Sequence, residues 1–191
     1  MSNTSFLVDL GWHGHYIEPI PDYFNKCRIR HEKNANTQSY NMAIGNKDDT
    51  VRINVSGALS SIDQVATEKF KNLDRAKNLI SNDEIEVSQI TLNKFLEEQN
   101  IDKAFNLLSV DVERYELNVL KGFDINFWKP KMVIIELHDQ NHDYKEMWPK
   151  MNKIVRYMEK ANYRVIYKDF TNTVYIRSKK KKQKNTQLQL T

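Results

Sequence analysis

Short apolar segments alternate with stretches of helical periodicity along most of the chain. Two apolar runs, one starting at Phe105 and one at 132–139, end in polar or acidic residues, as buried parallel strands do. Apolar and polar residues alternate at 51–55, which predicts a half-exposed strand. A helix with one apolar face is predicted after Pro149. This order of elements predicts a doubly wound α/β sheet.

Cap and turn signals place further elements. A strand is predicted at 40–44, and Thr91 is the expected N-cap of a helix at 92–99. The last two strand-like segments, 163–167 and 173–177, are separated by turn residues and predict a closing antiparallel hairpin. The sequence contains no internal repeat.

The segment 8–14 has two interpretations. It resembles a glycine-rich nucleotide loop after a strand; alternatively, residues 3–10 end a helix and 15–18 form a strand. The two cannot both hold, because Asp9 and Glu18 are nine residues apart and a parallel crossover needs a dozen or more.

The second interpretation is favoured because two prolines follow Glu18. Pro19 and Pro21 end the strand and precede a helix-like stretch at 22–30. Glu18 is then an acidic residue at a strand end, where nucleotide-binding sheets commonly place the acceptor for ribose hydroxyls.

Acidic residues also follow the strand that starts at Phe105. Ligands of open α/β sheets bind outside the carboxyl ends of the strands, so Asp111 and Glu113 are candidates for chemistry. The alternative is structural, because Asp is a preferred N-cap and Asp111 precedes a helical segment.

Composition fits one folded domain at 1–178 with a basic tail at 179–191. The chain has 191 residues, 40% of them hydrophobic and 28% charged. No apolar run approaches the roughly 20 residues that a bilayer span needs. A single cysteine, Cys27, excludes an intrachain disulfide and a cysteine zinc cluster. The start of the chain lacks secretory features, and together these observations favour a cytoplasmic protein.

The net charge of +4 belongs to the tail. Five lysines lie within 179–184, and without them the net charge is −1. Lysine tails can hold nucleic acid or anionic membrane, but no element that would read bases accompanies this one. We therefore expect a solvated tail and no specific nucleic-acid partner.

The residues from Ser109 to Asp124 resemble the signature D-x-E-G-x-E-x-x-V-L-K-G of FkbM-type methyltransferases. Residues 12–24 resemble the G-W-x-G-x-x-I-E-P-x-P-x-x-F segment of that family, and 129–138 resemble the strand that follows its signature. The matches keep the order of the family over residues 2–177. The resemblance implies a Rossmann-like class I sheet, S-adenosylmethionine as cofactor, and methylation of oxygen atoms in small molecules or sugars.

The resemblance also implies roles for residues. Glu18 would accept hydrogen bonds from the cofactor ribose, and Ala43 and Ile44 would lie against its adenine. Asp111 would face the methionine part of the cofactor or the methyl acceptor. The acceptor side would be lined by a base, an orienting group or a metal ligand, namely Glu113, Glu136 and His138.

Methyl transfer suits these residue types. The reaction is an in-line displacement that depends on positioning, and a hydroxyl acceptor must also lose a proton. Glu136 and His138 alternate on a strand and should share a face, although His138 could be a scaffold residue. A divalent metal such as magnesium is possible with these ligands, but no spacing requires one.

Two departures from the family pattern leave a second interpretation open. Arg114 replaces the signature glycine, which is costly if that position needs a positive φ. The first, central strand of the family sheet, with its glycine-rich loop, is also expected to be missing. The alternative is thus an inactive remnant acting as a binding module. The acceptor, which we would look for at 57–82, and the oligomeric state do not follow from the sequence.

Overall fold

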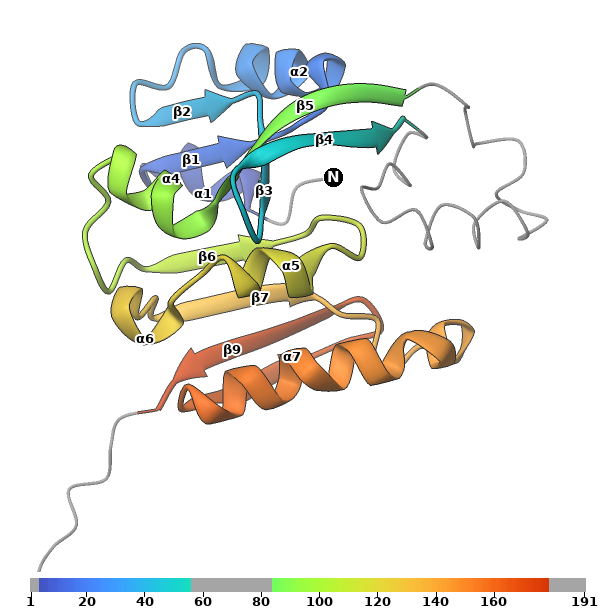
Figure 1. The fold of residues 1–191 in the computed structure, drawn as a ribbon. Coiled ribbons are helices and arrows are strands. Elements are labelled where there is room, and N and C mark those ends of the chain that lie inside the picture. The colour runs from blue at the N-terminus through green and yellow to red at the C-terminus, as the bar shows by residue number, and fades with distance from the viewer. Residues whose placement is uncertain (1–3, 56–83, 179–191) are drawn as a thin grey trace, which may run out of the picture.

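The computed structural model describes residues 4–55 and 84–178, except the side chain of Asp143. Both stretches contain helices and strands (Figure 1). In chain order they are α1 (Ser5–Asp9), β1 (Gly14–Ile17), α2 (Pro21–His31), β2 (Thr37–Tyr40), β3 (Ala43–Gly45), β4 (Asp49–Asn54), β5 (Glu84–Thr91), α4 (Leu92–Glu98), β6 (Leu107–Val110), α5 (Glu116–Lys121), α6 (Ile125–Trp128), β7 (Met132–Glu136), η2 (His142–Met147), α7 (Trp148–Lys160), β8 (Tyr163–Lys168) and β9 (Asn172–Arg177).

The strands form three hydrogen-bonded groups, and the fold is mixed α/β. β1 pairs in parallel with β2, and β5 lies between parallel β3 and antiparallel β4. The third group has the order β6-β7-β9-β8, in which β6 and β7 are parallel and β9 is antiparallel to both of its neighbours. Among the described residues the strands thus have the mixed α/β character that the sequence predicts, arranged as three hydrogen-bonded groups.

Most predicted elements are present. The N-terminal helix and β1 support the second interpretation of 8–14, because a helix and not a strand precedes Gly14. Thr91 caps α4 through its side chain, which accepts from the Lys94 amide at 3.2 Å. In the β8–β9 turn, Asp169 accepts from the amides of Thr171 and Asn172. The predicted hairpin is therefore confirmed.

The single strand predicted at 40–44 is wrong. The chain leaves β2 after Tyr40 and resumes in β3, which pairs with a different group. Asn41 explains the break, since its side-chain amide donates to the carbonyls of Glu18 and Pro19 and holds the chain against the end of β1.

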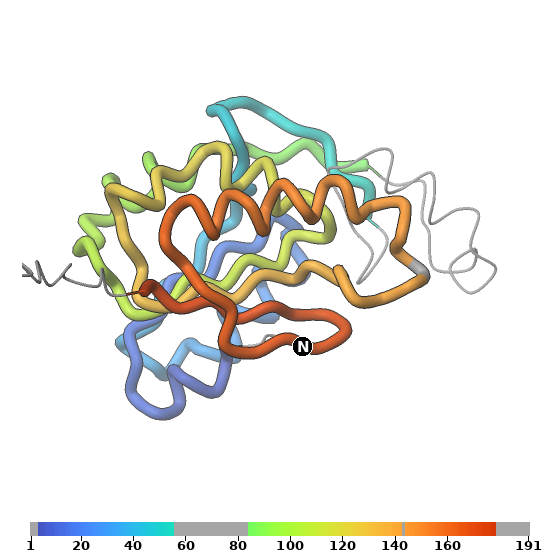
Figure 2. The backbone as a smooth tube through the Cα atoms, turned by 90° about the horizontal axis from the view of Figure 1, so that it is seen from below, coloured from blue at the N-terminus to red at the C-terminus, as the bar shows by residue number. Residues whose placement is uncertain are grey.

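The main core lies between the four-stranded group and the helices packed on it. α7 runs beside α5 across this group, as two perpendicular views show (Figures 1 and 2). The predicted apolar face of α7 supplies Ile154 and Met158, which pack with Val133 and Tyr175 of the sheet. These four residues are at most 1% exposed.

Gly122 allows α5 to approach β3 closely. A Cβ at this position would lie 2.1 Å from the carbonyl oxygen of Gly45, far inside contact distance. The glycine that closes the signature is therefore explained by backbone packing. Among the described residues, no helix combines the length and apolar character needed to cross a bilayer.

Candidate active site

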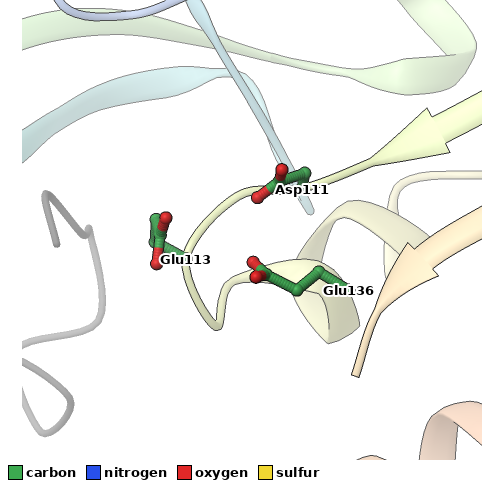
Figure 3. A group of neighbouring side chains, drawn as sticks. All are labelled: Asp111, Glu113 and Glu136. Carbon is green, nitrogen blue, oxygen red and sulfur yellow. The ribbon is translucent and has the colours of Figure 1, made fainter. Parts of the chain in front are cut away.

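The parallel strands β6 and β7 bring two acidic residues together at their carboxyl ends. Val110 is in register with Ile135, so Asp111 and Glu136 follow at adjacent positions. Glu113 lies on the loop after β6, and one carboxylate oxygen from each of the three residues lies within 4.8 Å of the others (Figure 3). All three residues were predicted as site residues from the sequence, but their mutual distances were not.

The loop between Asp111 and α5 is held in an unusual conformation. Glu113 and Arg114 both have positive φ angles, 48° and 77°. α5 begins at Glu116 with Tyr115 as its N-cap, so the alternative that Asp111 caps this helix is wrong. The Arg114 amide donates to Oε1 of Glu116 at 2.8 Å, which fixes the loop from the helix side.

The position of Arg114 does require a positive φ, as the glycine of the family signature suggested. An arginine in the left-handed region costs roughly 1–2 kcal/mol. The conformation persists because neighbours constrain it: besides the bond to Glu116, Nζ of Lys150 on α7 donates to the Arg114 carbonyl.

Burial raises the pKa of three carboxyl groups around the loop. Glu116 is only 5% exposed, and burial raises its pKa to about 7. Burial and the charges of Glu136 and Asp111 raise the pKa of Glu113 to about 8. Asp111 is exposed as a whole residue, but neighbouring protein atoms surround its carboxyl group and desolvate it. This desolvation and the hydrogen bond to Glu136 raise the pKa of Asp111 to about 7. At neutral pH these three carboxyl groups therefore retain protons.

Glu136 is the member that stays ionised. Burial alone would raise its pKa, but hydrogen bonds from His138 and Asp111 outweigh burial and lower it. His138 Nε2 lies 3.0 Å from Oε1 of Glu136. Burial opposes the imidazolium, yet Glu136 and the Phe170 carbonyl raise the pKa of His138. Glu136 and His138 thus form an ion pair at the end of β7.

A pocket of about 190 Å³ adjoins this ion pair. Three predicted acceptor-side residues line it: Glu113, Glu136 and His138. The remaining lining residues come from the Arg114 loop, the end of β7, η2 and α7, namely Arg114, Glu116, Leu137, Tyr144, Met147, Lys150, Met151 and Ile154. Sequence patterns could not reveal Tyr144 or Lys150, because neither occurs in a motif and only the tertiary packing of η2 and α7 brings them here.

Three of the predicted cofactor residues, Glu18, Ala43 and Ile44, do not line this pocket. Glu18 follows β1, whose carboxyl end points in the same direction as those of β6 and β7 (Figure 1). Its Oε1 accepts from the Ile20 amide at 3.0 Å, and burial raises its pKa. Ala43 and Ile44 are 3% and 9% exposed within β3, so their side chains belong to the core.

The three clustered carboxylates are oxygen ligands of the kind that magnesium and calcium prefer. Their protons compete with any such cation, since ligating carboxylates must be ionised. Nothing in this geometry requires a metal.

Comparison with known proteins defines the class. The family described as Methyltransferase FkbM domain matches residues 1–165, so the chain belongs to the FkbM methyltransferase family. It is similar to Methyltransferase 1 of Beauveria bassiana (strain ARSEF 2860), with 28% identity over 139 residues, covering 67% of this chain and 56% of that protein.

A solved structure is also similar, the crystal structure of methyltransferase FkbM from Methylobacillus flagellatus KT. The identity is 14% and the TM-score 0.48, with 85% of this chain and 36% of that chain covered. The chain thus spans little more than half the length of one relative and about a third of the other.

Proposed function

We propose that the chain is an S-adenosylmethionine-dependent methyltransferase that methylates a hydroxyl oxygen of a small molecule or sugar. The observation that carries the proposal is the pocket at the ends of β6 and β7, where Glu113, Glu136 and His138 converge. Family membership supports methyl transfer, and the carboxylates supply what a hydroxyl acceptor needs, a group that takes its proton.

Glu113 is the proposed general base. It lines the pocket, and its pKa of about 8 lies close to a working pH, which is the condition for efficient proton transfer. Glu136 is the orienting group, because its ion pair with His138 keeps it an acceptor for the substrate hydroxyl. His138 touches Glu136 and acts through it as a positioning residue.

S-adenosylmethionine, when bound, supplies the electrophilic methyl group. Asp111 and Glu136 fit the neighbourhood of a sulfonium cation, since both lie at strand ends within one acidic cluster. Glu18 is the proposed acceptor for the ribose hydroxyls, because its carboxylate is fixed by the Ile20 amide at the end of β1. Ala43 and Ile44 are proposed to border the adenine through their backbone, as their side chains are buried.

The finer fold proposal is a Rossmann-like class I sheet in which β1 and β6 flank the position of the family's central strand, which the described residues do not supply. Both strands run in the same direction (Figure 1), and within 4–55 and 84–178 each pairs along one edge only. These edges also favour the alternative function, an inactive methyltransferase-like module that binds ligand without methyl transfer.

Isothermal titration with S-adenosylhomocysteine tests the proposal. We expect saturable binding by the folded chain, and methyl transfer from S-adenosylmethionine to a hydroxyl compound in a radiolabel assay. Binding without transfer to any member of a broad acceptor panel would favour the module. No heat of binding from a folded sample would contradict both.

A further inference from the structure

Arg114 lines the pocket, and its backbone has a conformation that is unfavourable for arginine. Its φ of 77° is a left-handed conformation in which glycine would be less strained. The amide bond to Glu116 and the carbonyl bond from Lys150 hold the residue in place from two sides. Strained residues fixed in this way concentrate at ligand sites, so the side chain is the feature to explain.

Tyr144 supports the Arg114 side chain. The guanidinium carbon lies 4.6 Å from the centroid of the Tyr144 ring, and that ring contacts His138 at a centroid distance of 4.6 Å. Stacking uses the face of a guanidinium, whereas its N–H donors lie in the plane. Five donors allow Arg114 to bind an oxyanion in addition to the contacts it already makes.

The other charged groups of the pocket are a cation and acidic residues that are hydrogen-bonded within the protein. Lys150 is a second cation on the lining. Among the acids, Glu136 is paired with His138, and Glu116 is buried and accepts from the Arg114 amide. Glu116 and Glu136 are thus engaged within the protein, whereas Arg114 and Lys150 place two positive charges on the lining of the pocket. The pocket therefore favours an anion.

We propose that Arg114, supported by Tyr144, makes this pocket selective for acceptors that carry an anionic group, a carboxylate or a phosphate, near the hydroxyl to be methylated. A guanidinium fork matches both groups in bidentate geometry. A volume of about 190 Å³, roughly that of six water molecules, admits a small hydroxy acid or the anionic end of a sugar derivative. The inference rests on the proposed function, because it names the acceptor class of the same pocket.

The test compares three sugars of similar size: glucose, glucuronate and glucose 6-phosphate. Ligand-observed NMR titration in the presence of S-adenosylhomocysteine gives a Kd for each without requiring turnover. We expect at least one anionic sugar to bind at least tenfold more tightly than glucose, and the two anionic arms to show whether the pocket prefers a carboxylate or a phosphate.

Variants at Arg114 then test whether this residue causes the preference for anionic sugars. Arg114→Gly should fold, because glycine suits the positive φ, and should bind all three sugars equally. Arg114→Lys should retain part of the preference, because it keeps the charge but loses the fork. The matched control is Lys153→Gln, an exposed cation on α7 outside the pocket, which should behave as the wild type.

Equal binding of glucose and both anions by the wild type would overturn the inference, as would an Arg114→Gly variant that keeps the preference. Failure of the proposed function gives a different result from failure of this inference. In that case S-adenosylhomocysteine gives no heat, while the anion preference and its loss in Arg114→Gly can still be measured without the cofactor product.

Discussion

His138 Nε2 and Glu136 Oε1 lie 3.0 Å apart, and this contact joins the end of β7 to the wall of the pocket. The pKa of Glu136 is lowered and that of His138 raised, so the folded state favours both charged forms. The pair stabilises the fold only while both groups are ionised, which defines a pH window.

The sign of each shift gives the window and the first prediction. Stabilisation from Glu136 is present above its unfolded pKa of 4.5 and is lost as the pH falls through its folded pKa. Stabilisation from His138 is complete below 6.5 and is lost as the pH rises through its folded pKa. His138→Gln should therefore lower the free energy of unfolding most at pH 5.5, by about 1–3 kcal/mol, and less at pH 9. Urea denaturation at the two pH values measures this; equal losses would contradict the ion pair.

The second prediction concerns the protonated carboxyl cluster. Asp111, Glu113 and Glu116 have raised pKa values, so the native state binds more protons than the unfolded state between about pH 4 and pH 7–8. Stability from these groups falls as the pH rises through that range. Glu113→Gln removes one such group and should stabilise the protein at pH 8 by about 1 kcal/mol, a value discounted for partial solvent access, with no gain at pH 4. Thermal melts at both pH values report the difference. The control is Glu97→Gln, at an exposed position on α4, which should give no comparable gain in stability at pH 8.

The same substitution yields the third prediction, for catalysis. Glu113→Gln keeps the shape of the proposed base but cannot accept the proton, so kcat should fall by about 100-fold or more. The Kd for S-adenosylhomocysteine should stay within a factor of about two, because Glu113 lines the pocket that we propose for the acceptor. A loss of cofactor binding with unchanged kcat would contradict the assigned role.

Glu18 carries the fourth prediction. Removing a charged hydrogen-bond acceptor from a ribose costs about 1.5–3 kcal/mol, so Glu18→Gln should weaken S-adenosylhomocysteine binding by roughly 10- to 100-fold. Glu97→Gln serves again as the exposed carboxylate control. Unchanged affinity in the Glu18 variant would place the ribose elsewhere.

The sequence predicts those site residues that directly follow a predicted strand. Asp111 and Glu113 follow an apolar run, and the rule that ligands bind at the carboxyl ends of strands identified both, whereas Glu136 was identified through the family resemblance. Asn41 shows where patterns fail: nothing in its neighbourhood distinguishes one strand from two, because the break depends on hydrogen bonds to carbonyls of another strand end. Tyr144 and Lys150 reach the pocket only through tertiary packing, which periodicity does not encode.

Other predictions stay open for physical reasons. The acceptor region at 57–82 and the lysine tail at 179–191 lie outside the described residues. Arg114 illustrates a partial success, since the sequence indicated a position that needs a positive φ, and the structure has it. The use of the arginine side chain depends on Tyr144, 30 residues further along, and so could not be foreseen.

The last prediction concerns the glycine that closes the family signature. A Cβ on Gly122 would lie 2.1 Å from the Gly45 carbonyl oxygen, and backbone cannot move aside without displacing α5 from β3. A Cβ on Gly45 would instead meet the side chain of Gln89 at 2.3 Å, and a side chain can shift more readily than backbone, at the cost of the Gln89 hydrogen bond to the Lys47 carbonyl. Both variants overpack the core, but Gly122→Ala should lower the free energy of unfolding by about 2–3 kcal/mol and Gly45→Ala by about 1 kcal/mol. Urea denaturation of the two variants tests the order. If Gly45→Ala proves the more costly, close backbone contact does not explain Gly122.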